Sequence, residues 1–332
     1  MTATPVSTTA DLFYALEPEG GVRAYQRIDV DPSTGEKARN FEVEAKSVVI
    51  ENLRGKEDSV SLDTAGFQFY KHTSKHTTFD NDEEIYREYY PESIELIKKL
   101  TGASRVELFD HSKFMHVCFL LPSKSNSGFF LSAIRRRSPG EPDSVSRRQP
   151  VAQVHVDQTA TSSIARVHRH LPAPDVPKLL EGRFQIINLW RPIAVPAVDW
   201  PLALCDYRSV DLEKDTFPTA LISAESTGET MGVKYNENHK WKYLHGMTPD
   251  EIVLIKWRVT SFCQSFGLSP DFFYLFPLAL IPFGMGALPF ALHIPVLVTQ
   301  PPPMEHLFAS QLNLGPLYFM TDSEDLLDLR SF

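Results

Sequence analysis

The sequence predicts a mainly β protein with flanking helices, an α+β fold whose core is a jelly roll, also called a double-stranded β-helix. Short apolar runs bounded by turn residues recur along the chain, whereas a single long stretch has clear helical periodicity. The sequence shows no alternating βαβ pattern, no internal repeat and no Gly-rich phosphate-binding loop. This combination is typical of an antiparallel barrel or jelly roll.

The elements can be assigned in chain order. Residues 24–63 are predicted to form short strands, because turn residues at 31–35 and a β-branched run at 47–50 leave no room for a long helix. Residues 82–100 are predicted to be helical, with an interruption at Pro91 where a second helix could begin, and to pack outside a sheet. Further strands are expected at 106–109, 151–156, 184–190, 202–205, 231–235 and 252–255, and helices at 162–171 and 176–181.

Composition is compatible with a globular enzyme. The chain has 332 residues, 42% of them hydrophobic, so it can bury a full core as one large or two small domains. A net charge of -9 gives no electrostatic footprint for nucleic acid. Cys118, Cys205 and Cys263 share no CxxC spacing, which argues against a disulfide framework and a thiolate metal site. The first ten residues do not resemble a signal peptide, so we expect a cytoplasmic protein.

The motif His155-Val156-Asp157 is the most informative feature of the chain. A His-x-Asp motif at the end of a strand supplies two of the three ligands of the facial triad that binds Fe(II) in non-haem oxygenases. The alternative is a hydrogen-bonded pair at a strand end. The motif alone leaves both interpretations open, and metal binding by His155 and Asp157 would need a second histidine far downstream to complete the triad.

Three further residues are candidates for contacts to a substrate or cosubstrate. Arg191 could hold a carboxylate, although a structural ion pair with Asp206 or Glu229 is an equal alternative. His239 and Trp241 could line a pocket, with core packing as the alternative.

Two histidines are not expected to bind metal. His168 and His170 lie two residues apart on a predicted helix and therefore face different directions, so we expect them at a helix end or on the surface.

Seven segments in order between residues 40 and 256 resemble the fungal hydroxylase/desaturase family of secondary-metabolite clusters. This family is of the aspergillic-acid hydroxylase type and is related to a small subunit of cephamycin methoxylation. The segments are 101–106 (TGASRV), 153–159 (QVHVDQT), 166–172 (RVHRHLP), 188–193 (NLWRPI), 202–206 (LALCD), 228–230 (GET) and 249–251 (PDE).

The resemblance implies an oxidoreductase that hydroxylates or desaturates a small-molecule intermediate with Fe(II) and 2-oxoglutarate. It implies His155 and Asp157 as metal ligands, together with the histidine of a Pro-His-Thr-Gly-Phe motif. An arginine of a Ser-Ile-Glu-x-Arg segment would pair with the distal carboxylate of 2-oxoglutarate. Neither segment is written in this chain. His293 lies close to the expected place by codon overlap, but its Leu-His-Ile-Pro surroundings differ from the motif.

Two stretches depart from the family pattern. Residues 113–133 separate Phe-Asp-His from Ile-Arg-Arg-Arg, which nearly adjoin in the family, and the codons at both ends can contain splice signals. Residues 292–313, read in a shifted frame, can encode the missing Pro-His-Thr-Gly-Phe motif. We therefore predict a hydroxylase/desaturase-like domain at 1–256 with an insertion at 113–133. The tail at 257–332 is predicted to be mistranslated through a retained intron and a shifted frame, so that this chain is impaired.

Two other classes of protein stay open. A non-catalytic accessory subunit would keep the fold, lack a complete triad and bind a partner oxygenase. A membrane-anchored protein would need residues 272–298, which contain no Asp, Glu, Lys or Arg, to cross a bilayer. The four prolines and two glycines of that stretch make a single spanning helix poor, so contact with a membrane is not expected.

Overall fold

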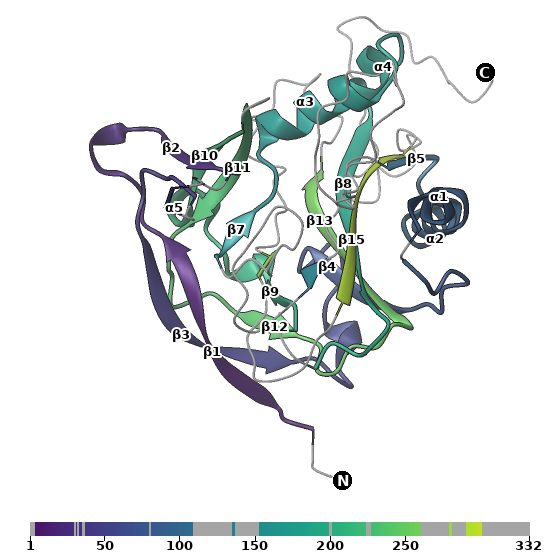
Figure 1. Ribbon diagram of the computed structural model, residues 1–332, viewed down its shortest axis with the longest axis horizontal. Helices are drawn as coiled ribbons and strands as arrows, with labels where there is room; N and C mark the ends of the chain where they lie inside the picture. The colour runs from purple at the N-terminus through teal and green to yellow at the C-terminus, as the bar shows by residue number, and fades with distance from the viewer. Residues whose placement is uncertain are drawn as a thin grey trace, which may run out of the picture.

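The computed structural model describes residues 4–29, 31, 33–34, 37–79, 81–108, 135–136, 153–198, 201–223, 227–259, 279–280 and 290–300. Over these residues the chain forms two β-sheets that share one hydrophobic core, with helices packed outside them (Figure 1). This arrangement confirms the mixed, mainly β class that the sequence predicts.

The larger sheet has nine strands among the described residues, in the order β1-β3-β12-β9-β14-β7-β11-β10-β2. Neighbouring strands pair antiparallel except β3 with β12 and β2 with β10. The strands are β1 (Ser7–Ala15), β2 (Ala24–Arg27), β3 (Val43–Asn52), β7 (His155–Val156), β9 (Ala203–Cys205), β10 (Thr216–Ile222), β11 (Thr227–Val233), β12 (Trp241–Tyr243) and β14 (Ala279–Leu280).

The smaller sheet is antiparallel throughout its described part, in the order β4-β13-β8-β15-β5, and β6 also pairs with β15. Its strands are β4 (Phe67–Lys71), β5 (Arg105–Leu108), β6 (Arg135–Arg136), β8 (Arg183–Ile193), β13 (Glu251–Val259) and β15 (Phe290–Gln300).

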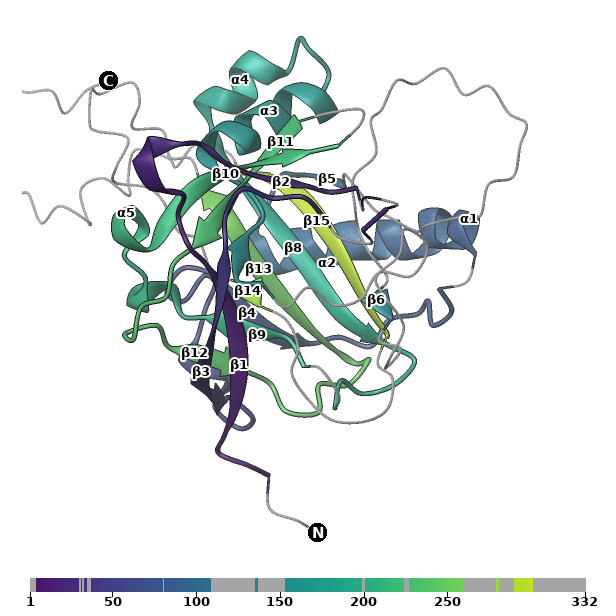
Figure 2. The ribbon, with the colours of Figure 1, turned by 60° about the vertical axis from the view of Figure 1, so that its left-hand side comes forward.

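The described helices are short and lie outside the sheets (Figures 1 and 2). The α-helices are α1 (Asp82–Glu84), α2 (Tyr90–Thr101), α3 (Ala160–His170), α4 (Val176–Glu181) and α5 (Leu212–Asp215). A π-helical turn, η3 (Ile85–Tyr89), joins α1 to α2, and single 3-10 turns are η1 (Glu19–Gly21), η2 (Glu57–Ser59) and η4 (Tyr207–Ser209).

The α2 helix confirms the prediction of a helix interrupted near Pro91. Proline lacks the N–H that would continue the ladder, and the preceding turn widens to the π form before α2 begins. The helix ends at Gly102, whose φ of 69° is left-handed and whose N–H donates to the Lys98 carbonyl. Ile97 is fully buried in a cluster that includes Leu189 and Leu254 of the smaller sheet, so α2 packs on its outer face as predicted.

Strand β8 is buried on both faces, which explains its nearly continuous apolar run. Phe184 and Ile186 belong to the core shared by the two sheets, whereas Ile187 and Leu189 belong to the cluster under α2. Alternation along the strand therefore directs Asn188 to the shared core and Arg191 to the α2 side.

Several element predictions are confirmed with shifted ends. The predicted helices at 162–171 and 176–181 correspond to α3 and α4, and strands form over parts of all six predicted segments. Strands β2 and β3 lie within the predicted strand region 24–63, whereas the sequence reading missed β1, β4, β6, β10, β12, β14 and β15.

The predicted insertion at 113–133 lies outside the described residues. Of the predicted tail at 257–332, the structure describes 257–259, 279–280 and 290–300, which belong to β13, β14 and β15. Within the described part of the chain, no helix is long and apolar enough to cross a membrane. Residues 290–298 form a strand, which contradicts a single membrane helix through 272–298.

Arg191 is a buried structural clamp. Its side chain is only 2% exposed, and its Nε donates to the Tyr89 hydroxyl at 3.0 Å. Its Nη1 donates to the carbonyl oxygens of His72 at 2.7 Å and Pro249 at 2.6 Å, and its Nη2 lies 2.7 Å from His72 Nδ1. Burial lowers the pKa of His72, with the Arg191 charge as a second cause, so neutral Nδ1 can accept this bond.

This environment corrects the predicted ion pairs of Arg191. Asp206 instead pairs with Arg208 at 2.6 Å, and Glu229 pairs with Arg23 at 2.6 Å. The sequence could not reveal this, because two of the four partners of Arg191 are backbone carbonyls and the other two, the Tyr89 hydroxyl and His72 Nδ1, lie about 100 residues away in sequence.

We predict that Arg191→Met lowers the free energy of unfolding by about 3 kcal/mol, because it leaves several buried acceptors unpaired. Arg87→Met is the matched control: Arg87 is 63% exposed and pairs with exposed Glu88, so its loss should leave the free energy of unfolding nearly unchanged. Urea unfolding measures both variants, and equal values for the two would refute the clamp.

Candidate metal centre

His155 and Asp157 lie at strand β7, in the middle of the larger sheet between β11 and β14. Val156 between them is fully buried in the core, whereas the His155 and Asp157 side chains are 24% and 33% exposed. Strand β11 fixes the register, because Gly232 lies opposite His155 and the Thr230 hydroxyl donates to the Val156 carbonyl. The backbone of the motif is therefore held in place, while the His155 and Asp157 side chains are partly accessible to solvent.

The two side chains direct potential ligand atoms at one another. His155 Nε2 lies 3.1 Å from Asp157 Oδ1, and His155 Nδ1 lies 2.8 Å from the Gln153 carbonyl oxygen. When Nδ1 carries the proton and donates to that carbonyl, Nε2 keeps its lone pair for a metal. Two donor atoms that sit about 2.1 Å from one ion at a right angle are separated by about 3 Å, so this pair fits as two ligands of a divalent cation.

The same distances are compatible with a hydrogen-bonded pair and with a shared cation. Both ring nitrogens of His155 face oxygen acceptors, Gln153 O and Asp157 Oδ1. A neutral imidazole has one N–H and can satisfy only one of them. The arrangement therefore suits an imidazolium or a cation shared by Nε2 and Oδ1, and ferrous iron is a cation that one imidazole and one carboxylate accept well.

The second oxygen of Asp157 has a different partner. Asn188 Nδ2 donates to Asp157 Oδ2 at 3.0 Å, and Asn188 is 1% exposed. Because Asn188 belongs to β8, this bond joins the smaller sheet to the end of β7 in the larger one.

The turn after Asp157 is held by the start of α3. Thr159 and Ser162 form a capping box, in which the Thr159 hydroxyl accepts from Ser162 N and the Ser162 hydroxyl accepts from Thr159 N. The Thr159 hydroxyl also donates to Glu229 Oε1 at 2.5 Å, and Arg23 pairs with the other oxygen of Glu229. This chain of contacts fixes the backbone on the downstream side of Asp157.

The structure does not bring Arg191 to this site. Asn188 and Arg191 lie on opposite faces of β8, and the Arg191 guanidinium contacts the side that α2 covers. It is therefore not a candidate for contacts near His155 and Asp157.

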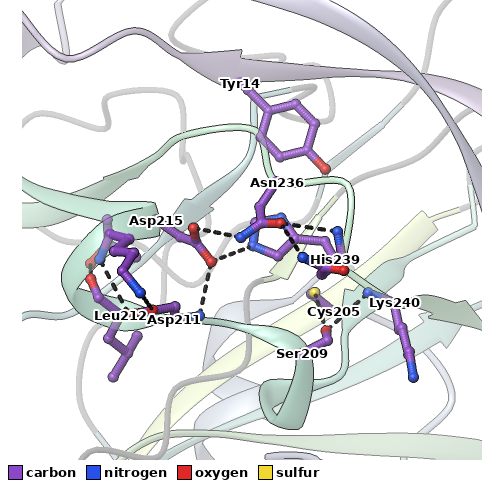
Figure 3. Close-up of polar contacts among 12 residues, drawn as sticks. Tyr14, Cys205, Ser209, Asp211, Leu212, Asp215, Asn236, His239 and Lys240 are labelled. Atoms are coloured by element: carbon purple, nitrogen blue, oxygen red, sulfur yellow. Dashed lines mark hydrogen bonds and ion pairs between the residues drawn. The ribbon is translucent and has the colours of Figure 1, made fainter.

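His239 lies with Tyr14 and Asp215 in a separate polar cluster (Figure 3), and Trp241 contacts Tyr14. Trp241 is 1% exposed, and its Nε1 donates to the Tyr14 hydroxyl at 2.8 Å, which agrees with core packing. His239 Nε2 lies 3.0 Å from Asp215 Oδ2, and its ring stacks on Tyr14 at a centroid distance of 6.1 Å. Asn236 donates to the other Asp215 oxygen, so the cluster ties the loop after β11 to α5.

His239 also borders a pocket of about 1040 Å³, formed by segments within 206–214 and 236–242. Neither Trp241 nor the His155–Asp157 pair lines this pocket. The predicted pocket contact thus holds for His239 alone, and the structure does not connect that pocket to the candidate metal centre.

A third ligand is not found among the described side chains, where no group of three His, Cys, Asp or Glu residues is arranged to hold a metal ion. His293 lies in β15, whose backbone register places it opposite Trp190 of β8 in the smaller sheet. The sequence did not favour His293 as a ligand, and its backbone position does not test that interpretation.

Sequence reasoning missed Asn188, Gln153 and Thr159 as supports of the motif. A signal was available for Asn188, since an amide inside the apolar run FQIINLW needs a buried partner. The carbonyl of Gln153 gave no signal, because backbone acceptors are the same at every residue.

Comparison with known sequences identifies relatives over most of the chain. A family model described as "Oxidoreductase/YMDC permease-like domain" matches residues 12–260. Hydroxylase/desaturase CTB9 of Cercospora beticola is 31% identical over 255 residues, which cover 73% of each chain. Fe(II)/2-oxoglutarate-dependent dioxygenase nvfI of Aspergillus novofumigatus is 27% identical over 248 residues, covering 73% of this chain and 80% of nvfI.

A solved structure shares the fold. The iron and alpha-ketoglutarate-dependent endoperoxidase NvfI superposes with a TM-score of 0.70 and 21% sequence identity, over 90% of this chain and 99% of NvfI. The likeness covers both sheets and shows that the arrangement of strands is that of a known protein.

We predict that stability falls between pH 7 and about pH 5, because burial lowers the pKa of His72, His239 and His170, the last to about 4. Histidine in an unfolded chain titrates near pH 6.5. Below that pH the unfolded state therefore binds more protons than the folded state does, and acid shifts the equilibrium toward unfolding. His170→Gln should reduce this loss, whereas His168→Gln, an exposed neighbour on α3, should not. Urea midpoints at both pH values test this, and an unchanged midpoint contradicts it.

Proposed function

We propose that this chain, which belongs to the fungal hydroxylase/desaturase family, is an oxidoreductase of secondary metabolism that uses Fe(II) and 2-oxoglutarate to hydroxylate or desaturate a small-molecule intermediate. The relatives carry the reaction class, because CTB9 is described as a hydroxylase/desaturase and nvfI as a dioxygenase dependent on Fe(II) and 2-oxoglutarate. The substrate is expected to be small, and neither nucleic acid nor a membrane is expected as a partner.

The observation that carries the proposal is the convergence of His155 Nε2 and Asp157 Oδ1 at 3.1 Å. One neutral and one anionic ligand suit a hard-to-borderline divalent ion such as Fe(II). Bound iron would supply the one-electron and dioxygen chemistry that removes hydrogen from an unactivated carbon, with 2-oxoglutarate as the source of two electrons.

The residues of this chain would hold and orient the metal. His155 would bind through Nε2 while the Gln153 carbonyl holds the proton on Nδ1. Asp157 would bind through Oδ1, and its negative charge would offset part of the charge of the ion. The partial exposure of both side chains would let a cosubstrate approach from solvent.

A jelly roll is the fold that we propose for these two sheets. The antiparallel pairing of the smaller sheet, the facing of two sheets over a common core and the position of His-x-Asp at a central strand support it. The cytoplasm is the compartment that we propose, because the three cysteines of the sequence lack the CxxC spacing of a disulfide framework or thiolate metal site.

We also propose that the chain is a hydroxylase/desaturase-like domain at 1–256 with an insertion at 113–133, followed by a mistranslated tail at 257–332, and that it is impaired for this reason. The family motifs that a shifted frame can encode support this division. The pairing of β14 and β15 with neighbouring strands is compatible with it, because ladder hydrogen bonds form between backbones whatever the side chains are.

We predict that a restored chain, without 113–133 and with the shifted-frame tail, converts 2-oxoglutarate and dioxygen to succinate and CO2 in the presence of Fe(II). The chain as written should do so roughly 100-fold more slowly or worse, because it lacks the motif histidine. His155→Ala in the restored chain should abolish the conversion.

The outcomes separate the alternatives. An inert restored chain that binds an oxygenase without metal would favour an accessory subunit. Equal rates for the written and restored chains would refute impairment while leaving the function in place.

A further inference from the structure

We propose that Asn188 is a positioning residue for metal binding. Its side-chain amide fixes the Asp157 carboxylate so that one oxygen stays directed at the position shared with His155. This inference rests on the proposed function, because it assigns a task to a residue that does not itself bind the metal.

The contacts of Asp157 divide its two oxygens between two partners. Oδ2 accepts from Asn188 Nδ2 at 3.0 Å, whereas Oδ1 lies 3.1 Å from His155 Nε2. Without a donor on Oδ2, the carboxylate could rotate and offer either oxygen or both. With that donor on Oδ2, Oδ1 would be the oxygen directed at the ion, and binding through one oxygen would leave more positions for a cosubstrate.

The amide itself has no freedom to move. Asn188 lies in the middle of β8, where Ile255 of β13 is its partner on one side and Pro295 of β15 on the other. Its side chain is 1% exposed. The donor is therefore anchored in the smaller sheet, while the carboxylate that it holds follows β7 of the larger sheet.

Burial of an amide at this place needs a compensating bond. Ile186, Ile187 and Leu189 surround Asn188 in sequence and are all fully buried. An apolar side chain would fill the position without the cost of removing an amide from water. The bond to Asp157 is the contact that the structure gives to the Asn188 nitrogen, so the amide serves the carboxylate.

Asn52 provides a matched comparison. It is 4% exposed, its Nδ2 donates to the Pro5 carbonyl at 2.8 Å, and its Oδ1 accepts from the backbone N–H groups of Arg54 and His245. These contacts secure loops and involve no candidate metal ligand. Asn52 is therefore a buried asparagine of structural role only.

Binding of Mn(II) to the full chain, measured as the loss of the EPR signal of the free ion, tests the inference without any need for turnover. Asn188→Ala should raise the apparent Kd for Mn(II) by about 10- to 100-fold, the usual effect of removing a group that orients a ligand. Asn188→Val keeps a strand-forming side chain and should raise the Kd by a similar factor. It therefore tests the inference even when the alanine variant folds poorly. Asn52→Ala should lower the unfolding midpoint and leave the Kd within about twofold of the parent value.

The outcomes separate this inference from the proposed function on which it depends. If His155→Ala weakens Mn(II) binding and both Asn188 variants bind as the parent does, the positioning role is refuted and the metal site stands. If the parent and His155→Ala bind Mn(II) alike, both the site and the positioning role are refuted. Weakening by Asn52→Ala equal to that by Asn188→Ala would also refute the positioning role, because general loosening would then suffice.

Discussion

The Asp157 carboxylate, shared between His155 and Asn188, is the contact on which the candidate metal centre depends. Its two oxygens meet a ring nitrogen from β7 at 3.1 Å and an amide from β8 at 3.0 Å, so both sheets fix it. The backbone supports it as well, because Gln153, whose carbonyl orients His155, forms a bridge with Phe13 of β1. Any change that separates the sheets at this point would move a ligand atom.

Buried polar groups elsewhere in the molecule serve the fold. Arg191 joins β8 to the segments at 72 and 249, and Asp215 gathers His239, Asn236 and the Asp211 N–H around one carboxylate. Each of these groups has several fixed partners of its own, which offset the cost of removing it from water. At the candidate metal centre, by contrast, two partly exposed side chains direct potential ligand atoms at one another. This difference separates a candidate binding site from a purely structural contact.

The sequence predicted the parts of the fold that depend on hydrophobic periodicity and on helix-capping or helix-breaking residues. Pro91 and Gly102 mark the start and end of α2, and the capping residues Thr159 and Ser162 mark the start of a helix that was expected. It missed β1, although Leu12 and Tyr14 alternate there, because Ser and Thr dominate its start. The candidate ligand pair was proposed from His-x-Asp together with the family resemblance, whereas the supports of that pair come from residues far apart in sequence. The acceptors of Arg191 could not be predicted, because carbonyl oxygens are present at every residue.

Pulsed EPR of the Mn(II)-loaded chain, labelled with ¹⁵N-histidine, is the most direct test of whether His155 and Asp157 hold a divalent ion. The account predicts a magnetic coupling between Mn(II) and a histidine nitrogen that is lost in His155→Ala. Coupling that persists unchanged in His155→Ala, or no histidine coupling in the parent chain, would contradict it.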